Sequence, residues 1–262
     1  MRTKGGLFAF INVVISTCTF GQTGDLNILT VDRPGIADMP FTVAPGMYQF
    51  EVGFDYFSRY NGDVYNLPVA MFRTGISSAA EIRVSTRNLM DYTESQKFAG
   101  FAPITVGVKV HIIEQNEWIP ETDIMAGMSF PVSHKPSQPR NLGHNIYLLF
   151  QNDFYPNMAL NYNVGMFWDG IHPTPFFSGA FCFNYQPTRR LGMFIEYYDY
   201  ANSDNPWEHG MDGGFTYLLM PHFQLDLSGG GSIIEDEMNY FVSTGFSIRL
   251  QKSALRSKQQ LD

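Results

Sequence analysis

The sequence contains only two cysteines among its 262 residues. One of them, Cys18, lies within residues 1–21, which have the basic start (Arg2 and Lys4), short apolar stretch and small residues of a secretory signal peptide. Removal of this peptide would leave Cys182 alone and exclude an intramolecular disulfide. An exported chain of this kind must be held together otherwise, and a closed, hydrogen-bonded barrel does so.

Two alternatives to a cleaved signal remain open for the N-terminus. In one, the apolar stretch is a buried strand or helix of a cytosolic protein. In the other, the segment 15–18 is a loose lipobox and Cys18 carries a lipid, although the threonine before this cysteine is atypical.

Positive charge is also scarce, with 17 Lys and Arg against 25 Asp and Glu and a formal charge of −8. Loss of Arg2 and Lys4 with the signal peptide would make this charge −10. Such acidity argues against nucleic acid as a partner.

Long apolar runs are missing as well, and the mean hydropathy is only −0.13. Beyond the N-terminus no stretch approaches the roughly 18 apolar residues of a membrane helix. A transmembrane β-barrel is not excluded by this absence, because every second residue of its strands is polar.

Catalytic and metal-binding motifs are absent too. There is no Gly-x-Ser-x-Gly stretch, and no His or Cys spacing matches a known metal site, so we expect no enzyme activity, no metal and no cofactor. An outer-membrane hydrolase built on His134 or His144 with Ser133 or Ser137 is the weaker alternative. The triple glycine at 229–231 precedes no expected helix, so it is predicted to end a strand and open a loop.

What the sequence does contain is alternation of apolar and polar side chains over about ten residues at a time. In the cleanest segment, 101–112, Val108 and Val110 point one way and Lys109 the other. This period of two indicates strands with one apolar and one polar face, and about 9–11 residues is the length that a tilted strand needs to cross a bilayer.

Twelve such segments are expected. They are 47–57, 67–76, 80–88, 101–112, 123–130, 145–153, 159–168, 176–185, 191–198, 211–219, 223–228 and 240–250.

The connections are expected to alternate in length, mostly short after even-numbered strands and longer after odd-numbered ones, as in outer-membrane barrels. We therefore predict an all-β fold: a transmembrane, antiparallel, up-and-down barrel over residues 46–250, with a polar tail at 251–262. A soluble β-sandwich is the alternative, but its strands average about five or six residues. Tyr56, Phe57, Trp168 and Tyr198 near strand ends are candidates for aromatic girdles.

The barrel interpretation places the protein in the outer membrane of a Gram-negative bacterium, with both termini in the periplasm. Its expected partners are membrane lipid and lipopolysaccharide, the barrel-assembly machinery and small solutes. The tail extends past the usual aromatic end of a last strand, so assembly is expected to use an internal signal near 246–250.

Charged residues of the predicted strands fall on the polar faces, where they would line a lumen. Either they form a charged constriction that selects solutes, or they pair into a network that fills a narrow barrel. The main candidates are Glu51, Arg73, Glu81, Arg83, Arg87, Lys109, Glu196, Asp226 and Arg249, together with Asp55, His111 and Asp123.

The segment 22–45 precedes the first expected strand and is long enough to enter the barrel. It is either a periplasmic tail or a plug that enters the barrel, with Asp32 or Arg33 pairing with a lumen charge.

Several short motifs resemble those of the outer-membrane family labelled "putative MetA-pathway of phenol degradation". They are TVDRPG at 30–35, VAPG at 43–46, YQFEVG at 48–53, LP at 67–68, FRTG at 72–75, EIR at 81–83, GFTY at 214–217, QLD at 224–226 and GF at 245–246. The resemblance runs from about residue 30 to 250. It implies a barrel of the transporter or channel type and brings no catalytic motif.

The function expected from these features is passive movement of small solutes, apolar or aromatic ones among them, through or beside a polar lumen. A closed barrel with a structural or surface-interaction role is the runner-up. A channel predicts flux that changes when Arg73 or Arg83 is substituted, and single-channel conductance of the refolded protein separates the two.

Overall fold

The computed structural model describes residues 29–93, 97–132 and 139–251. The predicted signal peptide and nearly all of the predicted C-terminal tail lie outside this part of the chain. No helix of the described residues is long and apolar enough to cross a membrane.

The described residues form one antiparallel sheet of thirteen strands. These are β1 (Met47–Arg59), β2 (Gly62–Ser77), β3 (Ala80–Thr93), β4 (Phe98–Phe101), β5 (Ile104–Ile113), β6 (Glu121–Phe130), β7 (Gly143–Tyr155), β8 (Met158–Trp168), β9 (Phe176–Tyr185), β10 (Leu191–Asn202), β11 (Asn205–Met220), β12 (Phe223–Ile234) and β13 (Glu237–Gln251).

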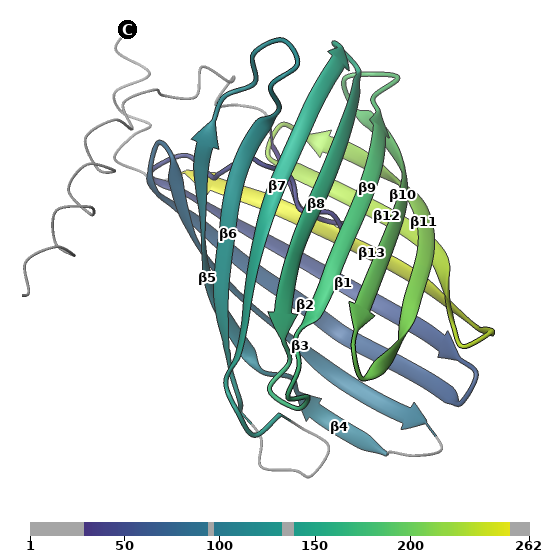
Figure 1. The fold of residues 1–262 in the computed structure, drawn as a ribbon. Helices are drawn as coiled ribbons and strands as arrows, with labels where there is room; N and C mark the ends of the chain where they lie inside the picture. The colour runs from purple at the N-terminus through teal and green to yellow at the C-terminus, as the bar shows by residue number, and fades with distance from the viewer. Residues whose placement is uncertain (1–28, 94–96, 133–138, 252–262) are drawn as a thin grey trace, which may run out of the picture.

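The sheet closes on itself, which confirms the predicted barrel. Each strand pairs with its sequence neighbours, and β1 pairs with β13 to complete the ring (Figure 1). The short β4 and the longer β5 both pair with β3 and are separated only by Ala102 and Pro103, so together they occupy one position in the wall. Proline lacks the N–H that a ladder needs. The barrel therefore has twelve wall positions, as predicted.

The two faces of the wall have opposite character. On β5, Val106 and Val108 are more than 40% exposed on the outside, whereas Lys109, the next residue along the strand, is fully buried inside. The largest buried side chains of the protein include Arg73, Glu51 and other polar residues rather than a conventional apolar core. An apolar exterior around a polar interior is the arrangement that a lipid environment requires.

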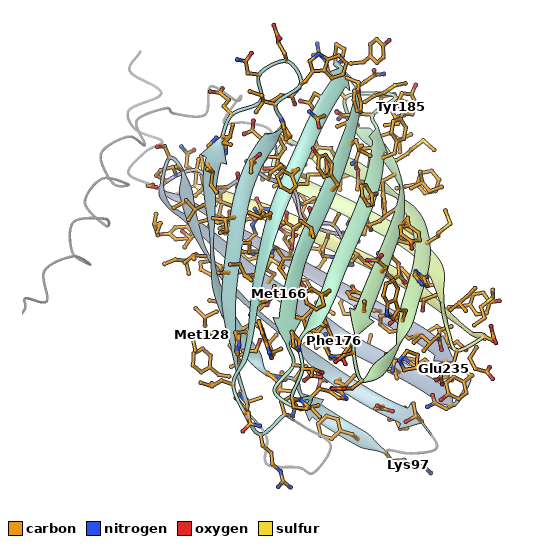
Figure 2. The ribbon with its side chains drawn as sticks, in the orientation of Figure 1. Lys97, Met128, Met166, Phe176, Tyr185 and Glu235 are labelled. Atoms are coloured by element: carbon orange, nitrogen blue, oxygen red, sulfur yellow. The ribbon has the colours of Figure 1, made fainter. Side chains whose placement is uncertain are left out.

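The predicted long loops at one end of the barrel are partly wrong. The segments expected as loops at 58–66, 201–209 and 229–239 belong mostly to strands, which run on as long hairpins. Figure 2 shows one of their tips at Glu235, toward the end of the barrel opposite to Tyr185. The end that carries Tyr185 is called the short-turn end below, and the other the hairpin end. Residues 169–175 do remain a longer connection, and the connection between β6 and β7 includes residues 133–138, which lie outside the described part of the chain.

The triple glycine shows why these loops were misplaced. Residues 229–231 lie inside β12 and pair with β11 and β13 on either side. A side chain at Gly230 would collide with Asp212 on β11, so glycine is needed there for close approach and not for a turn. The girdle candidate Tyr198 is also wrong, because its side chain points inward and is only 4% exposed.

A charge placed on the outer face tests the orientation of the wall. Val108→Arg should lower the free energy of unfolding by about 2–4 kcal/mol, since an arginine near the bilayer midplane loses its hydration. Denaturant titration in phospholipid vesicles measures this, and Val108→Leu is the matched control, for which little change is expected. An equal stability of the arginine variant would mean that this face does not meet lipid.

Candidate functional site in the barrel lumen

The segment 29–46 runs through the interior of the barrel before β1 begins. It appears in Figure 1 as the purple trace behind β6, β7 and β8. Its backbone N–H groups donate to carboxylates on three different strands: Glu51 on β1, Glu81 on β3 and Glu196 on β10. A segment anchored to these separate strands lies across the lumen.

Asp32 is at the centre of the strongest cluster of charges. One oxygen of its carboxylate lies 3.1 Å from Arg73, 3.0 Å from Arg83 and 3.2 Å from Lys109. These three cations come from β2, β3 and β5, which are neighbours in the wall. Because all four side chains are almost entirely buried, each charge needs these partners in place of water.

The surroundings keep Asp32 ionised. Burial alone would raise the pKa of its carboxyl, but the positive charges of Arg73, Lys109 and Arg83 outweigh burial and lower the pKa well below its usual range. Asp32 therefore carries its negative charge at any pH near neutrality.

Arg73 ties two strands and the N-terminal segment together. Its guanidinium is 2.9 Å from Glu81 and 3.0 Å from Glu51, and it donates to the carbonyl of Phe41 at 2.9 Å. Glu81 in turn accepts the backbone N–H of Val43 at 2.6 Å. The carboxylates on β1 and β3 thus hold both an arginine and the backbone of the segment.

Arg33 contacts the inner face of the wall on the other flank of β1, at β12 and β13. Its guanidinium is 3.1 Å from Asp226 and donates to Ser243 at 2.8 Å. Gly53 and Gly245 face each other on β1 and β13, and a side chain at either position would occupy the space of this guanidinium. The absence of side chains at these two glycines therefore leaves the space that the Arg33 guanidinium occupies against the wall.

Glu196 holds the middle of the segment. Its two carboxylate oxygens accept the N–H groups of Ile36 at 2.6 Å and Ala37 at 2.5 Å. No cation of the described residues lies within ion-pair distance of Glu196. This contact therefore depends on two hydrogen bonds to backbone, which distinguishes it from the contacts of Asp32 and Arg33.

The segment separates two cavities in the lumen. The cavity on the side of the hairpin end, which Figure 2 draws at the bottom, is called the upper cavity; it has a volume of about 390 Å³ and is lined by residues that include Ile36, Asp38 and Tyr200. The lower cavity, of about 270 Å³, is lined by Ala37 and by residues of β7 to β12 nearer the short-turn end. Asp32, Arg33 and Gly35 border both cavities, so this part of the chain is the partition between them.

The remaining predicted lumen residues are placed as follows. Arg249 donates to Gln49 and to the carbonyl of Thr30. Arg87 lies on the inner face of β3 but is exposed, and no carboxylate of the described residues is within ion-pair distance of it. Asp55 is 3.8 Å from Arg33.

Nearer the short-turn end, the imidazole Nδ1 of His111 lies 2.9 Å from Asp123. The neighbouring Glu121 is 3.3 Å from the same nitrogen. No group of three or more His, Cys, Asp or Glu among the described residues is arranged to hold a metal ion.

Two acidic residues of the lumen were missed by the sequence analysis. Asp38 is 2.9 Å from Arg83, but it lies in an irregular segment that has no periodic pattern to reveal its direction. Asp212 faces Glu196 across β10 and β11, and continuing the alternation of β11 from Gly214 would have placed it inside.

The residues of the hydrolase alternative are only partly described. Ser133, His134 and Ser137 lie outside the described residues. The ring of His144 stacks on Trp168 at 4.5 Å, at the hairpin end of β7 and β8.

Comparison with known proteins gives a family and a fold. The sequence matches the family described as "Putative MetA-pathway of phenol degradation" over residues 31–250. No curated protein matches the chain.

Solved structures of outer-membrane barrels share the architecture. The COG4313 outer membrane channel from Pseudomonas putida F1 aligns with a TM-score of 0.60 and 9% identity, covering 84% of this chain and all of that one. The NanC porin aligns with a TM-score of 0.55 and 10% identity, covering 77% and 100% of the two chains. The KdgM porin aligns with a TM-score of 0.50 and 8% identity, covering 76% of this chain and 98% of that one. At these identities the likeness concerns the fold.

Removing one charge should release the segment from the wall. Asp32→Asn leaves three buried cations short of a partner, which costs about 3 kcal/mol and corresponds to about 100-fold faster amide exchange. Hydrogen-exchange mass spectrometry of peptides that cover 29–46 measures this. Asp236→Asn, in the turn between β12 and β13, is the control. Unchanged exchange in Asp32→Asn would show that the cluster does not hold the segment.

Proposed function

The chain belongs to the family described as "Putative MetA-pathway of phenol degradation", and from this premise we propose that it is an outer-membrane channel for the passive movement of small solutes. Apolar or aromatic solutes are among those that the family description suggests. The single observation that carries the proposal is the pair of cavities inside a closed barrel, one on each side of the segment 29–46.

The N-terminal segment acts in this proposal as the plug that controls the channel. Cavities of about 390 and 270 Å³ have the size of small-molecule sites. The partition between them belongs to a segment that is separate from the wall, so it can shift without opening the ring of strands. The lumen charges close to it serve mainly to hold this plug in place.

The orientation follows from the two ends of the barrel. The chain enters β1 and leaves β13 at the short-turn end, where the turns between β2 and β3 and between β7 and β8 are tight. Outer-membrane barrels carry short turns on the periplasmic side. We therefore place both termini in the periplasm and the long hairpins outside the cell, next to lipopolysaccharide. Insertion requires the barrel-assembly machinery.

Conductance tests the function and the role of the plug together. The refolded protein should give small, discrete steps in a planar bilayer. Glu196→Ala should raise the step size severalfold, because the N–H groups of Ile36 and Ala37 lose their acceptor and the partition loosens. Glu208→Ala removes a carboxylate of β11 that forms no ion pair within the described chain, and it should leave the steps unchanged.

A heat-modifiability gel confirms that each variant is a folded barrel. A folded protein that never conducts, even as Glu196→Ala or with 29–45 deleted, would contradict the channel and favour a structural barrel. Conductance that is large in the original protein and equal in the variants would contradict the plug alone.

A further inference from the structure

One sector of the barrel wall carries almost no charge. Strands β8 and β9 contain no Asp, Glu, Lys or Arg, and β7 contains only Asp153, two residues before its end. The inner face of this sector presents asparagine, serine, tyrosine and small apolar side chains to the lumen. The ion pairs that the described residues of the plug form are all made elsewhere, with β1, β2, β3, β5 and β12.

The partition is apolar where it meets this sector. Ala37 packs against Ala180 and Cys182 of β9 and Tyr198 of β10, and each of these four residues is at most 6% exposed. Ile36 packs against the same group. Ala180 lines the upper cavity and Cys182, two residues further along the same face of β9, lines the lower one. The contact of Ala37 with β9 is therefore the barrier between the cavities.

Unused hydrogen-bond acceptors lie on both sides of this barrier. The side-chain amide oxygens of Asn145 and Asn163 on the upper cavity, and of Asn161 on the lower one, are buried and accept no hydrogen bond from the described residues. Asn161 and Asn163 are more than nine-tenths buried. A buried acceptor without a partner is unfavourable, and a solute with a hydroxyl or N–H group would satisfy it.

The plug is also held most lightly here. Asp32 and Arg33 are fixed by several ion pairs, whereas the only polar contacts that hold Ile36 and Ala37 within the described part of the chain are two hydrogen bonds to Glu196. A small outward shift at Ile36 and Ala37 would join the cavities and leave the charge cluster intact.

We infer that small uncharged solutes with a hydrogen-bond donor cross the barrel along β7, β8 and β9, past Ala37 and Cys182. The charged wall stays closed around Asp32 during this passage. Ions pass less readily than neutral solutes because the neutral sector offers them no counter-charge, which agrees with the small conductance steps expected of the unmodified protein. This inference rests on the proposed channel function and adds the route and the class of solute.

The native cysteine tests the route directly. With Cys18 changed to Ser, Cys182 is the only thiol. In vesicle-reconstituted protein it should react with neutral methyl methanethiosulfonate at least tenfold faster than with the cationic trimethylammonium or the anionic sulfonate reagent. Each rate is divided by that of the same reagent with the unfolded protein, and mass spectrometry measures the modified fraction.

A matched thiol on the charged wall is the control. Ser247 is fully buried on the inner face of β13, between Glu51 and Gln224 in register, and its hydroxyl has no hydrogen-bond partner among the described residues. Ser247→Cys in a Cys182→Ala background should remain unreactive with all three reagents. Ser228→Cys on β12, which is also buried and unpartnered, serves if the first variant does not fold.

Three results would overturn the inference. Equal rates for neutral and charged reagents at Cys182 would remove the selection for uncharged solutes. Equal reactivity of Cys182 and the thiol at position 247 would mean that the whole plug leaves the lumen. An unreactive Cys182 in protein that conducts would place the route elsewhere. The conductance of the unmodified protein is measured separately, so a failed route is distinguishable from a failed channel function.

Discussion

The barrel interior depends on how its buried charges are neutralised. Lipid outside the barrel forces the charged side chains of the strands inward. Within the narrow lumen Arg73 pairs with Glu51 and Glu81 of the wall, but among the described residues Lys109 forms an ion pair only with the N-terminal segment, and the nearest carboxylates to Arg83 also belong to that segment. Asp32 supplies the central negative charge that all three share. A charge that is buried without a partner is strongly destabilising. The N-terminal segment and the wall therefore neutralise each other's buried charges.

This requirement divides the barrel into two sectors. Strands β1, β2, β3, β5 and β12 hold the plug through ion pairs, while β7 to β9 form no ion pair with it among the described residues, and β9 meets it through apolar contact. The first sector fixes the position of the segment, and the second leaves room for two cavities. One closed barrel can therefore hold the segment firmly in one sector and leave space for a solute beside it in the other.

Much of the fold was predictable because it depends on local pattern. Alternation along β5 predicted that Lys109 faces inward and Val108 outward, and both are so placed. The hairpin end was predicted less well. Polar and glycine-rich residues such as those at 229–231 are typical of loops, yet they continue as paired strand because the neighbouring strands need close approach there. Pairing with a neighbouring strand overrides the local preference.

The sequence by itself determined the strands, their inner and outer faces and the inward direction of the charges, because a period of two is a property of consecutive residues. Only the tertiary structure decided which charges meet. Asp32 and Lys109 are 77 residues apart, and Arg33 and Asp226 are 193 apart. Ring closure and the course of the segment 29–46 through the lumen bring these pairs together. Both depend on the free energy of the whole assembled barrel, which no single segment encodes.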